Sequence, residues 1–412
     1  MTTEAAAGSA PPLARNRNYN VLWGSQLLSE LVSQLCLIAF PLMVLAATGS
    51  APRMGAVTAV VAAARMTANV PAGVLVDRFD RKLVMLVCQC GRALAMASLA
   101  VALYSGRFSM AHVLVVAAVE GALGAAFDPA EHAALPQVVP ESQLSQAVAR
   151  NTVRTYLATL LGPASAGFLL AVEPMFPFAV AVVLLLASCV VLCFLRLSRR
   201  RRLERPKEAD MLTDGFRWVL GHRVIRATLV WLMCCELFVS ALIIIVLAAS
   251  GERDMAPGEL GVIMIGFGAG GLLGAAVAGR LHAALPAPAV IIGFPAVGAA
   301  LTLVMALVPT GVLTGVVLGG IAFFIPTAFT TVMTYQLTVA PDELRGRLSG
   351  VVGLFAGGAG AIGPLAGGLL MAGGDSRHSL LVCAGCMAVV AGGTALSPAL
   401  RRFPAPNEMR AR

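Results

Sequence analysis

The chain has 412 residues, of which 58% are hydrophobic and only 12% are charged. Its mean hydropathy of +0.85 is typical of a polytopic membrane protein and excludes an ordinary soluble globular domain. The formal net charge of +9 does not indicate a nucleic-acid partner, because the basic residues gather between apolar runs, as membrane topology requires.

Apolar runs long enough to cross a bilayer recur along the chain. A hydrocarbon core of about 30 Å requires roughly 20 apolar residues in a helix. The predicted spans are residues 21–47, 55–76, 83–104, 111–130, 146–172, 177–195, 224–249, 259–283, 287–308, 311–335, 347–372 and 379–399. The sequence therefore predicts an all-α polytopic membrane protein with 12 transmembrane helices.

A polar stretch divides these spans into two sets of six. The expected organisation is a tail at 1–18, a first half at 19–196, a linker at 197–223, a second half at 224–400 and a tail at 401–412. The first tail has no pattern of a cleaved signal peptide. The linker contains a basic run and then a short apolar helical face, made of Arg199–Arg202 and of Met211, Leu212, Phe216, Val219 and Leu220. This face predicts an interfacial helix among membrane lipids.

Positive charge falls mainly on one side of the predicted spans. With a cytoplasmic N-terminus, the cytoplasmic segments contain Arg15, Arg17, Arg78, Arg81, Lys82, Arg199–Arg202, Arg345, Arg347, Arg401 and Arg402. The opposite segments contain Arg53, Arg107, Arg253 and Arg377. The positive-inside rule therefore predicts that both termini are cytoplasmic.

The two halves repeat each other in sequence. The matching elements are Phe127-Asp-Pro129 with Phe324-Ile-Pro326, Pro140 with Pro341, and Gly162-Pro163 with Gly363-Pro364. They fall at corresponding places near the fourth and tenth spans and within the fifth and eleventh. Secondary transporters use such repeats to place a binding site between two halves that rock against each other.

Six ionisable residues lie inside predicted spans, where each costs roughly 2.5–3.5 kcal/mol. They are Glu30, Arg65, Arg92, Glu120, Arg154 and Glu236. These acids and arginines are either buried pairs that hold helices together or functional groups, and Arg154 has the further alternative of reaching the interface. A carboxylate in a low-dielectric medium can bind and release a proton near neutral pH. We expect proton coupling through Glu236 first, Glu120 second or Glu30.

Enzymatic signatures are missing from the sequence. It contains no Walker A motif, no nucleophile elbow and no metal-ligand spacing, and Cys383 and Cys386 are interpreted as apolar packing residues. We therefore expect a protein that is no enzyme, carries no cofactor or metal, and uses an ion or substrate gradient.

Two motifs resemble signatures of the major facilitator superfamily. The loop Gly73-x-x-x-Asp77-Arg78-x-x-Arg81-Lys82 resembles the gating motif between its second and third helices. The segment Gly162-Pro163-x-x-x-Gly167 resembles its antiporter signature, and the second half contains a fuller form at Gly363, Pro364, Gly367 and Gly368. The alternatives are an ordinary positively charged loop and kinked packing helices.

Longer stretches resemble one branch of that superfamily, the twelve-span exporters that include enterobactin exporters and macrolide efflux proteins. They are residues 16–26, Ala39-Phe-Pro41, Asp128-Pro129-Ala130 and 341–347. The resemblance implies proton-coupled export of a lipophilic antibiotic, metabolite or siderophore from the bacterial cytoplasm by a monomer in the cytoplasmic membrane. It also implies that Glu30, Glu120 and Glu236 face a central cavity. One departure is Ala117, at a position where drug–proton antiporters often carry an arginine.

Two other functions stay open at this point. One is proton-coupled import of a small nutrient, which the same architecture supports. The other is a sensor or scaffold that keeps a transporter fold without transport. The costly carboxylates inside predicted spans favour transport over the scaffold.

Overall fold

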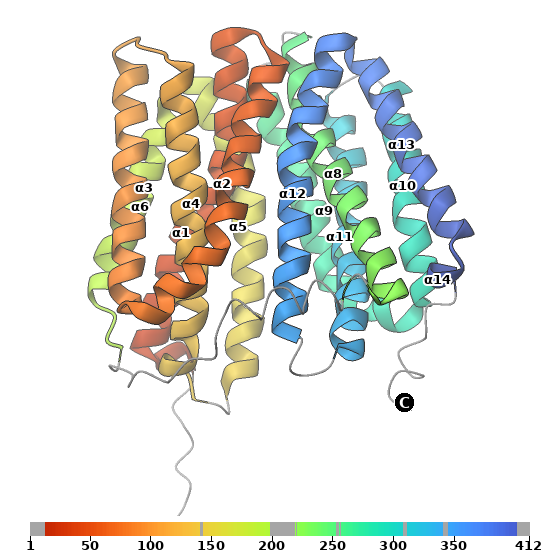
Figure 1. Cartoon of the computed structure of the whole chain (residues 1–412). Helices are drawn as coiled ribbons and strands as arrows, with labels where there is room; N and C mark the ends of the chain where they lie inside the picture. The colour runs from red at the N-terminus through yellow and green to blue at the C-terminus, as the bar shows by residue number, and fades with distance from the viewer. Residues whose placement is uncertain are drawn as a thin grey trace, which may run out of the picture.

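The computed structural model describes residues 13–140, 143–197, 219, 221–252, 255, 257–307, 311–340 and 345–401. This part of the chain is helical and contains no strand. Besides the short η1 (Leu13–Arg15) and α14 (Pro398–Arg401), its helices are α1 (Arg17–Thr48), α2 (Ala51–Arg78), α3 (Arg81–Tyr104), α4 (Met110–Val138), α5 (Leu144–Val172), α6 (Phe176–Cys193), α8 (Arg223–Glu252), α9 (Pro257–Ala284), α10 (Ala287–Leu307), α11 (Val312–Val339), α12 (Arg345–Gly373) and α13 (Ser376–Leu396) (Figure 1).

Each predicted span corresponds to one long helix. Within the described ranges, 11 of these helices are long and apolar enough to cross a membrane. The exception is α2, which has the required length but contains Arg53, Arg65, Asp77 and Arg78. The all-α membrane fold is therefore confirmed, with α2 as the least apolar of the twelve predicted spans.

The largest difference in helix length concerns α4. We expected this span to end at residue 130, but the helix continues to Val138 through Pro129 and Pro136. Polar residues after residue 130 had indicated a loop. They form instead a final part of the helix in which Glu131 is buried.

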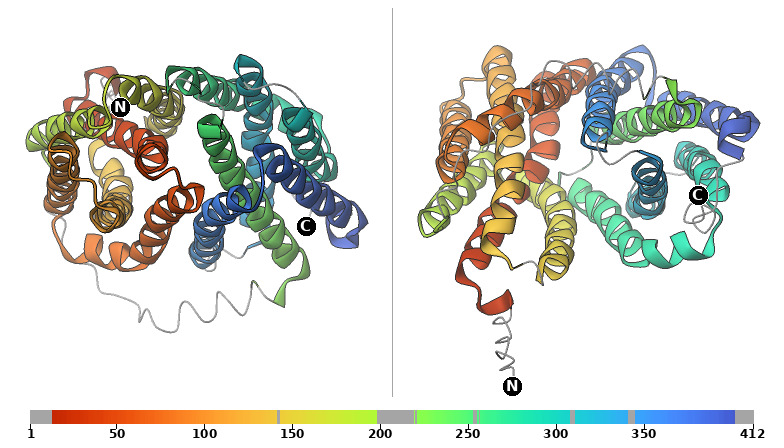
Figure 2. Two further views of the ribbon diagram at one scale, coloured as in Figure 1. Left: turned by 90° about the horizontal axis from the view of Figure 1, so that it is seen from above. Right: turned by 60° about the horizontal axis from the view of Figure 1, so that its bottom comes forward.

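The two sets of helices pack in the same pattern (Figure 2). In α1–α6, the main contacts are α1 with α5 and α6, α2 with α4, and α3 with α4 and α6. In α8–α13, the matching contacts are α8 with α12 and α13, α9 with α11, and α10 with α11 and α13. The sequence repeat is thus a repeat of helix packing.

The glycines of the Gly-Pro segments lie where two helix backbones approach closely. A Cβ atom at Gly162 of α5 would lie 2.5 Å from Cβ of Gln34 in α1. A Cβ atom at Gly363 of α12 would lie 2.7 Å from the carbonyl oxygen of Leu237 in α8. No side chain fits at such distances, so both glycines are required by corresponding helix contacts, α5 on α1 and α12 on α8.

The two sets meet through α2 with α12 and α5 with α9, on the side opposite the chain ends. There a Cβ atom at Gly368 of α12 would lie 2.6 Å from the carbonyl oxygen of Ala51, and Gly261 of α9 packs closely against α5. Toward the side of η1 and α14, which we call the termini side, Cβ atoms at Gly73 and Gly350 would meet nothing within 4 Å. The two sets are therefore packed together on the side opposite the termini, and Gly73 and Gly350 face open space on the termini side.

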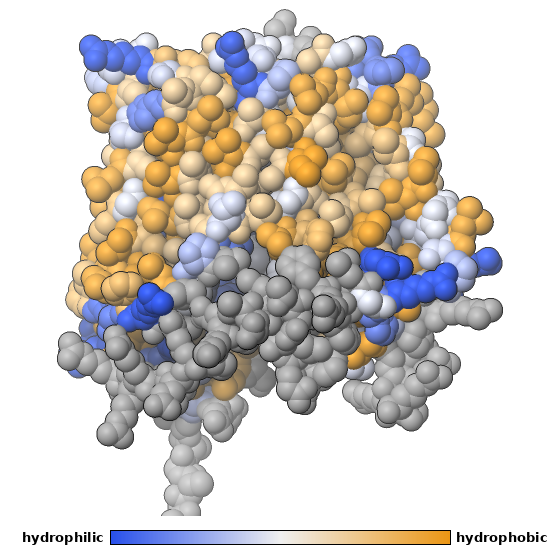
Figure 3. All heavy atoms as spheres, in the orientation of Figure 1, coloured by the Kyte–Doolittle hydropathy of each residue, from blue (hydrophilic) through white to orange (hydrophobic). Residues whose placement is uncertain are grey.

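The outer surface fits a membrane environment. Figure 3 shows an apolar band across the face of the molecule, with hydrophilic residues gathered at its rims. Large apolar side chains on several helices are exposed, such as Leu94 at 72% and Val389 at 76%. Exposed apolar surface of this extent is costly in water and favourable in lipid.

The linker prediction lies mostly outside the described residues. The basic run Arg199–Arg202 and the apolar positions Met211, Leu212, Phe216 and Leu220 are not described, and Val219 is buried. The expected interfacial helix stays a prediction.

Candidate functional site

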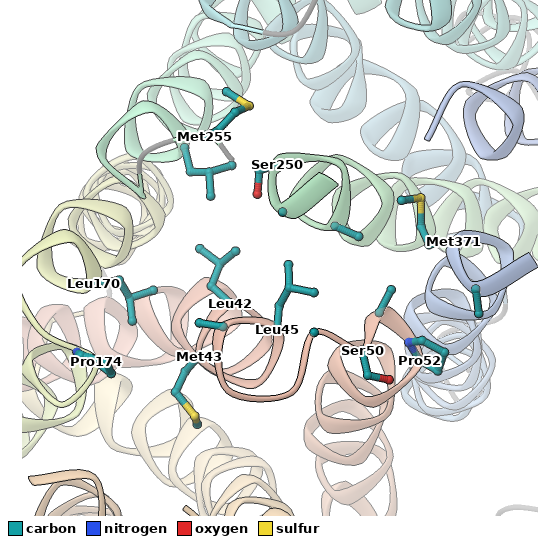
Figure 4. Close-up of a pocket in the computed structure, with 17 residues that line it drawn as sticks. Leu42, Met43, Leu45, Ser50, Pro52, Leu170, Pro174, Ser250, Met255 and Met371 are labelled. Carbon is teal, nitrogen blue, oxygen red and sulfur yellow. The ribbon is translucent and has the colours of Figure 1, made fainter. Parts of the chain in front are cut away.

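A cavity of about 870 Å³ lies between the two sets of helices, at the ends of α1, α5, α8 and α12 and the starts of α2 and α9 (Figure 4). It lies on the side opposite the termini. Leu42 and Leu45 of α1 line it from the first set, and Ser250 and Met371 line it from the second. Of its 17 described lining residues, only Ser50 and Ser250 have polar side chains. The side chains that line the cavity are therefore mostly apolar and suit a largely apolar molecule.

Two of the predicted intramembrane charges form a pair deep inside the first set. Arg92 of α3 and Glu120 of α4 are 0% and 3% exposed and make a two-pronged ion pair, with 2.8 Å between Nε of Arg92 and Oε2 of Glu120. The guanidinium also donates to Ser29, Ser33 and Gln89.

This placement differs from the expected one. The resemblance implied that Glu120 faces a central cavity, but its carboxylate is enclosed among α1, α3 and α4. Every hydrogen-bonding group of the Arg92 guanidinium has a partner, and the pair joins α1, α3 and α4.

A second cluster lies nearer the termini side. Nε of Arg154 in α5 lies 3.1 Å from Oε2 of Glu30 in α1, and Nη1 of Arg154 lies 3.9 Å from Oε1 of Glu131 in α4. The Arg154 side chain is 7% exposed, so it does not extend to the interface as one alternative proposed. Glu131 was missed because we expected this helix to end at residue 130, just before Glu131.

The third arginine, Arg65 of α2, does not pair with any of the three predicted acids. It forms an ion pair with Asp128 of α4, and the two side chains are 41% and 50% exposed. In the sequence, Asp128 was notable only as part of a motif. Its position shortly before the end of the expected span gave no signal that it would meet Arg65.

Glu236 of α8 stands apart from the arginines. Its side chain is partly buried, and a Cβ atom at Gly360 of α12 would lie 3.8 Å from its Oε1 atom. Within the described ranges, its carboxylate makes no hydrogen bond or ion pair. Among the predicted acids it is therefore the one with the fewest constraints on its protonation.

Three residues of the charged loop make hydrogen bonds within the first set of helices. Asp80 accepts a hydrogen bond from the backbone of Leu83 and caps α3. Arg81 donates to the carbonyl oxygen of Ala133 in α4, and Lys82 donates to the carbonyl oxygen of Cys193 at the end of α6. These contacts join α3 to its neighbours within the first set. The side chain of Asp77 lies outside the described residues.

The chain is similar to known bacterial transporters. It is 29% identical over 344 residues to an uncharacterized MFS-type transporter, YfiS, from Bacillus subtilis, with 78% of each chain covered. It is also 29% identical over 357 residues to the multidrug efflux pump Tap from Mycolicibacterium fortuitum, covering 82% of this chain and 85% of Tap.

Solved structures agree on the fold. The nucleoside transporter NupG has a TM-score of 0.76 at 11% identity, covering 92% of this chain and 98% of NupG. A bacterial homolog of the human lysosomal transporter Spinster, solved in an inward-facing and unoccupied conformation, has a TM-score of 0.69 at 14% identity, covering 96% of this chain and 98% of the homolog. The sequence pattern of one transporter family matches residues 22–364. The chain belongs to the Major Facilitator Superfamily.

Proposed function

We propose that this protein exports a hydrophobic or amphipathic small molecule by proton antiport, with its two halves alternating access to the two sides of a bacterial cytoplasmic membrane. Both termini face the cytoplasm, because the positive charges of the connecting segments gather on that side. The protein works as a single chain with substrate, protons and lipids as partners, and with no catalytic step or cofactor.

The observation that carries the proposal is the apolar cavity. Its volume of about 870 Å³ falls within the range of small-molecule sites, and it is lined from both sets of helices. A polar nutrient such as a sugar needs several aligned hydrogen-bonding groups, because buried polar groups without partners are costly. Ser50 and Ser250 alone do not supply them. The similarity to a multidrug efflux pump supports the same direction of transport.

The direct test is accumulation of lipophilic compounds in bacterial cells with and without the protein. We expect expression to lower the cellular level of at least one compound in a panel of lipophilic dyes and antibiotics that includes ethidium, and collapse of the proton gradient to remove the difference. Gradient-driven uptake of a polar nutrient without efflux of any panel compound supports import instead. No gradient-dependent movement of any compound supports a sensor or scaffold.

Filling the cavity should reduce export. Ala46 of α1 lines the cavity and is exposed, so Ala46→Phe adds a ring without a clash in the core. We expect the half-saturating concentration of the transported dye to rise about tenfold, which corresponds to ~1.4 kcal/mol of binding free energy. The matched control is Ala47→Phe, since Ala47 is also exposed but does not line the cavity. Equal effects of both variants would exclude this cavity as the binding site.

Proton coupling is tested at the three predicted acids. Glu236→Gln is expected to have the largest effect, since its carboxylate has no partner among the described residues, whereas Glu120 is held by Arg92. Neutralising a coupling acid should abolish uphill efflux and leave downhill exchange intact, because only the uphill process requires the proton. Proton-driven efflux should be compared for Glu236→Gln, Glu120→Gln and Glu30→Gln. Uphill pumping by all three, together with a wild type insensitive to the proton gradient, rejects proton antiport.

A further inference from the structure

The cluster of Glu30, Glu131 and Arg154 contains more negative than positive charge. Glu131 is 2% exposed, and Oε1 of Glu131 and Nη1 of Arg154 are both buried without a hydrogen-bond partner. These two atoms lie 3.9 Å apart, too far for a hydrogen bond but close enough for an ion pair. Nε of Arg154 is bonded to Glu30 at 3.1 Å. One guanidinium thus faces two carboxylates and forms a hydrogen bond with only one of them.

The Arg92–Glu120 pair shows what a balanced arrangement looks like in the same half. There one carboxylate faces one guanidinium, and both oxygens are bonded. In the second cluster the excess negative charge is buried, and such a charge is costly unless a proton or another cation neutralises it. Of the two acids, Glu131 is the buried one and the Glu30 side chain is 23% exposed, so the excess charge favours binding of a proton at Glu131.

The helix packing does not require these charges. By the spacing of the repeated motifs, Phe127 corresponds to Phe324, so Glu131 corresponds to Ala328, which is fully buried in α11. Gly162 corresponds to Gly363, so Arg154 corresponds to Phe355 in α12. The second half makes the matching helix contacts with apolar side chains at these two positions. The charged cluster is thus specific to the first half.

An exposed histidine lies next to the buried carboxylate of Glu131. Nδ1 of His132 lies 3.5 Å from Oε2 of Glu131, and the His132 side chain is 72% exposed. The other charged or titratable groups near Glu131 are Tyr19 of α1, which is itself near Arg150 of α5, and Asp128 of α4, which is paired with Arg65 of α2. On α3, Arg81 is bonded to the backbone at Ala133. Within the described ranges, Arg154 is therefore the cation that the two acids share.

We propose that Glu131 and Glu30 share one exchangeable proton, and that this pair, with Arg154 between them, is a second proton-binding site besides Glu236 on which uphill export depends. When the proton is bound to Glu131, Arg154 pairs with Glu30 alone. When the proton leaves through His132, Nη1 of Arg154 closes the 3.9 Å gap to Glu131. The coupling role depends on the proposed proton-driven export, whereas the presence of a shared proton does not.

Infrared difference spectroscopy of the full chain in phosphatidylethanolamine–phosphatidylglycerol vesicles tests the shared proton without a transported compound. As the pH is lowered, the Glu236→Gln background, which removes the carboxyl of the other candidate acid, should gain the C=O band of one buried carboxylic acid. Glu131→Gln and Glu30→Gln should each lose this band, because each leaves one acid balanced by Arg154. The matched control Glu173→Gln, at an exposed acid outside the cluster, should keep it. A band that persists in both cluster variants overturns the proposal.

The coupling role is tested in the same vesicles with ethidium as the probe. With an imposed pH gradient, Glu131→Gln should lose at least about nine-tenths of uphill ethidium movement and keep downhill exchange, a tenfold effect or more. Loss of the infrared band with undiminished uphill movement overturns the coupling role. If the wild type moves neither ethidium nor any other panel compound, the proposed export fails, and the infrared bands still decide whether the shared proton exists.

Discussion

Arg92→Gln is expected to destabilise the protein strongly and to lower the amount of folded protein in the membrane. Arg92 is fully buried and donates to Glu120, Ser29, Ser33 and Gln89. Its loss leaves a buried carboxylate without a cation, and breaking a buried pair in this way lowers the free energy of unfolding by about 3–5 kcal/mol. The measurement is the thermal denaturation midpoint of the purified protein, together with its yield from membranes.

The double variant Arg92→Leu with Glu120→Leu is the control for this prediction. It removes both charges at once, so no unpaired charge stays buried, and replacing both members of a buried pair by apolar residues is often close to neutral. We expect the double variant to recover most of the lost stability. If Arg92→Gln is as stable as the wild type, or if the double variant is less stable than the single one, the pair is not a structural link between α3 and α4.

The spans could be predicted because the bilayer imposes a length and an apolar composition on each helix. The predicted and observed boundaries of most helices differ by a few residues. The end of α4 could not be predicted, since Glu131, His132 and Pro136 are typical of a loop when only the sequence is considered. In the fold, this part of α4 stays helical with Glu131 buried opposite Arg154 of α5, while His132 stays exposed.

From the sequence, the candidate site could be predicted only as a set of ionisable residues that lie deep inside predicted membrane spans. Depth selected Glu30, Arg92, Glu120 and Arg154, but it did not show which acid meets which arginine, because partners lie on helices far apart in sequence. The pairs Arg92–Glu120 and Arg154–Glu30 follow from how α3 meets α4 and how α1 meets α5. Arg65 pairs with Asp128, which its predicted depth in the membrane had not marked as a candidate.

Asp77→Asn is expected to leave the protein in the membrane at its normal level and to slow transport at least about tenfold, or ~1.4 kcal/mol in the rate-limiting step. Asp77 lies in the last turn of α2. On the termini side, α2 faces open space at Gly73, and α12 faces open space at Gly350. On the other side of the molecule, the same two helices are in close contact.

Alternating access requires α2 and α12 to come together on the termini side and to separate on the other side. We propose that, when the termini side closes, the Asp77 carboxylate binds the positive N-terminal end of α12, which begins with Arg345. Asparagine has nearly the same shape but no charge, so it weakens this contact and the outward-facing state that depends on it. The measurement is the initial efflux rate of the transported dye per amount of protein in the membrane.

Asp80→Asn provides a matched control in the same loop. Asp80 caps α3 through the backbone of Leu83, and asparagine is nearly as good a helix cap as aspartate. This variant removes the same charge three residues away, so it tests whether the loss of negative charge alone slows transport. We expect a normal rate for Asp80→Asn and a severe loss for Asp77→Asn. A normal rate for Asp77→Asn refutes the ionic latch, and equal losses in both variants show that the loop acts through its overall charge and not through one contact.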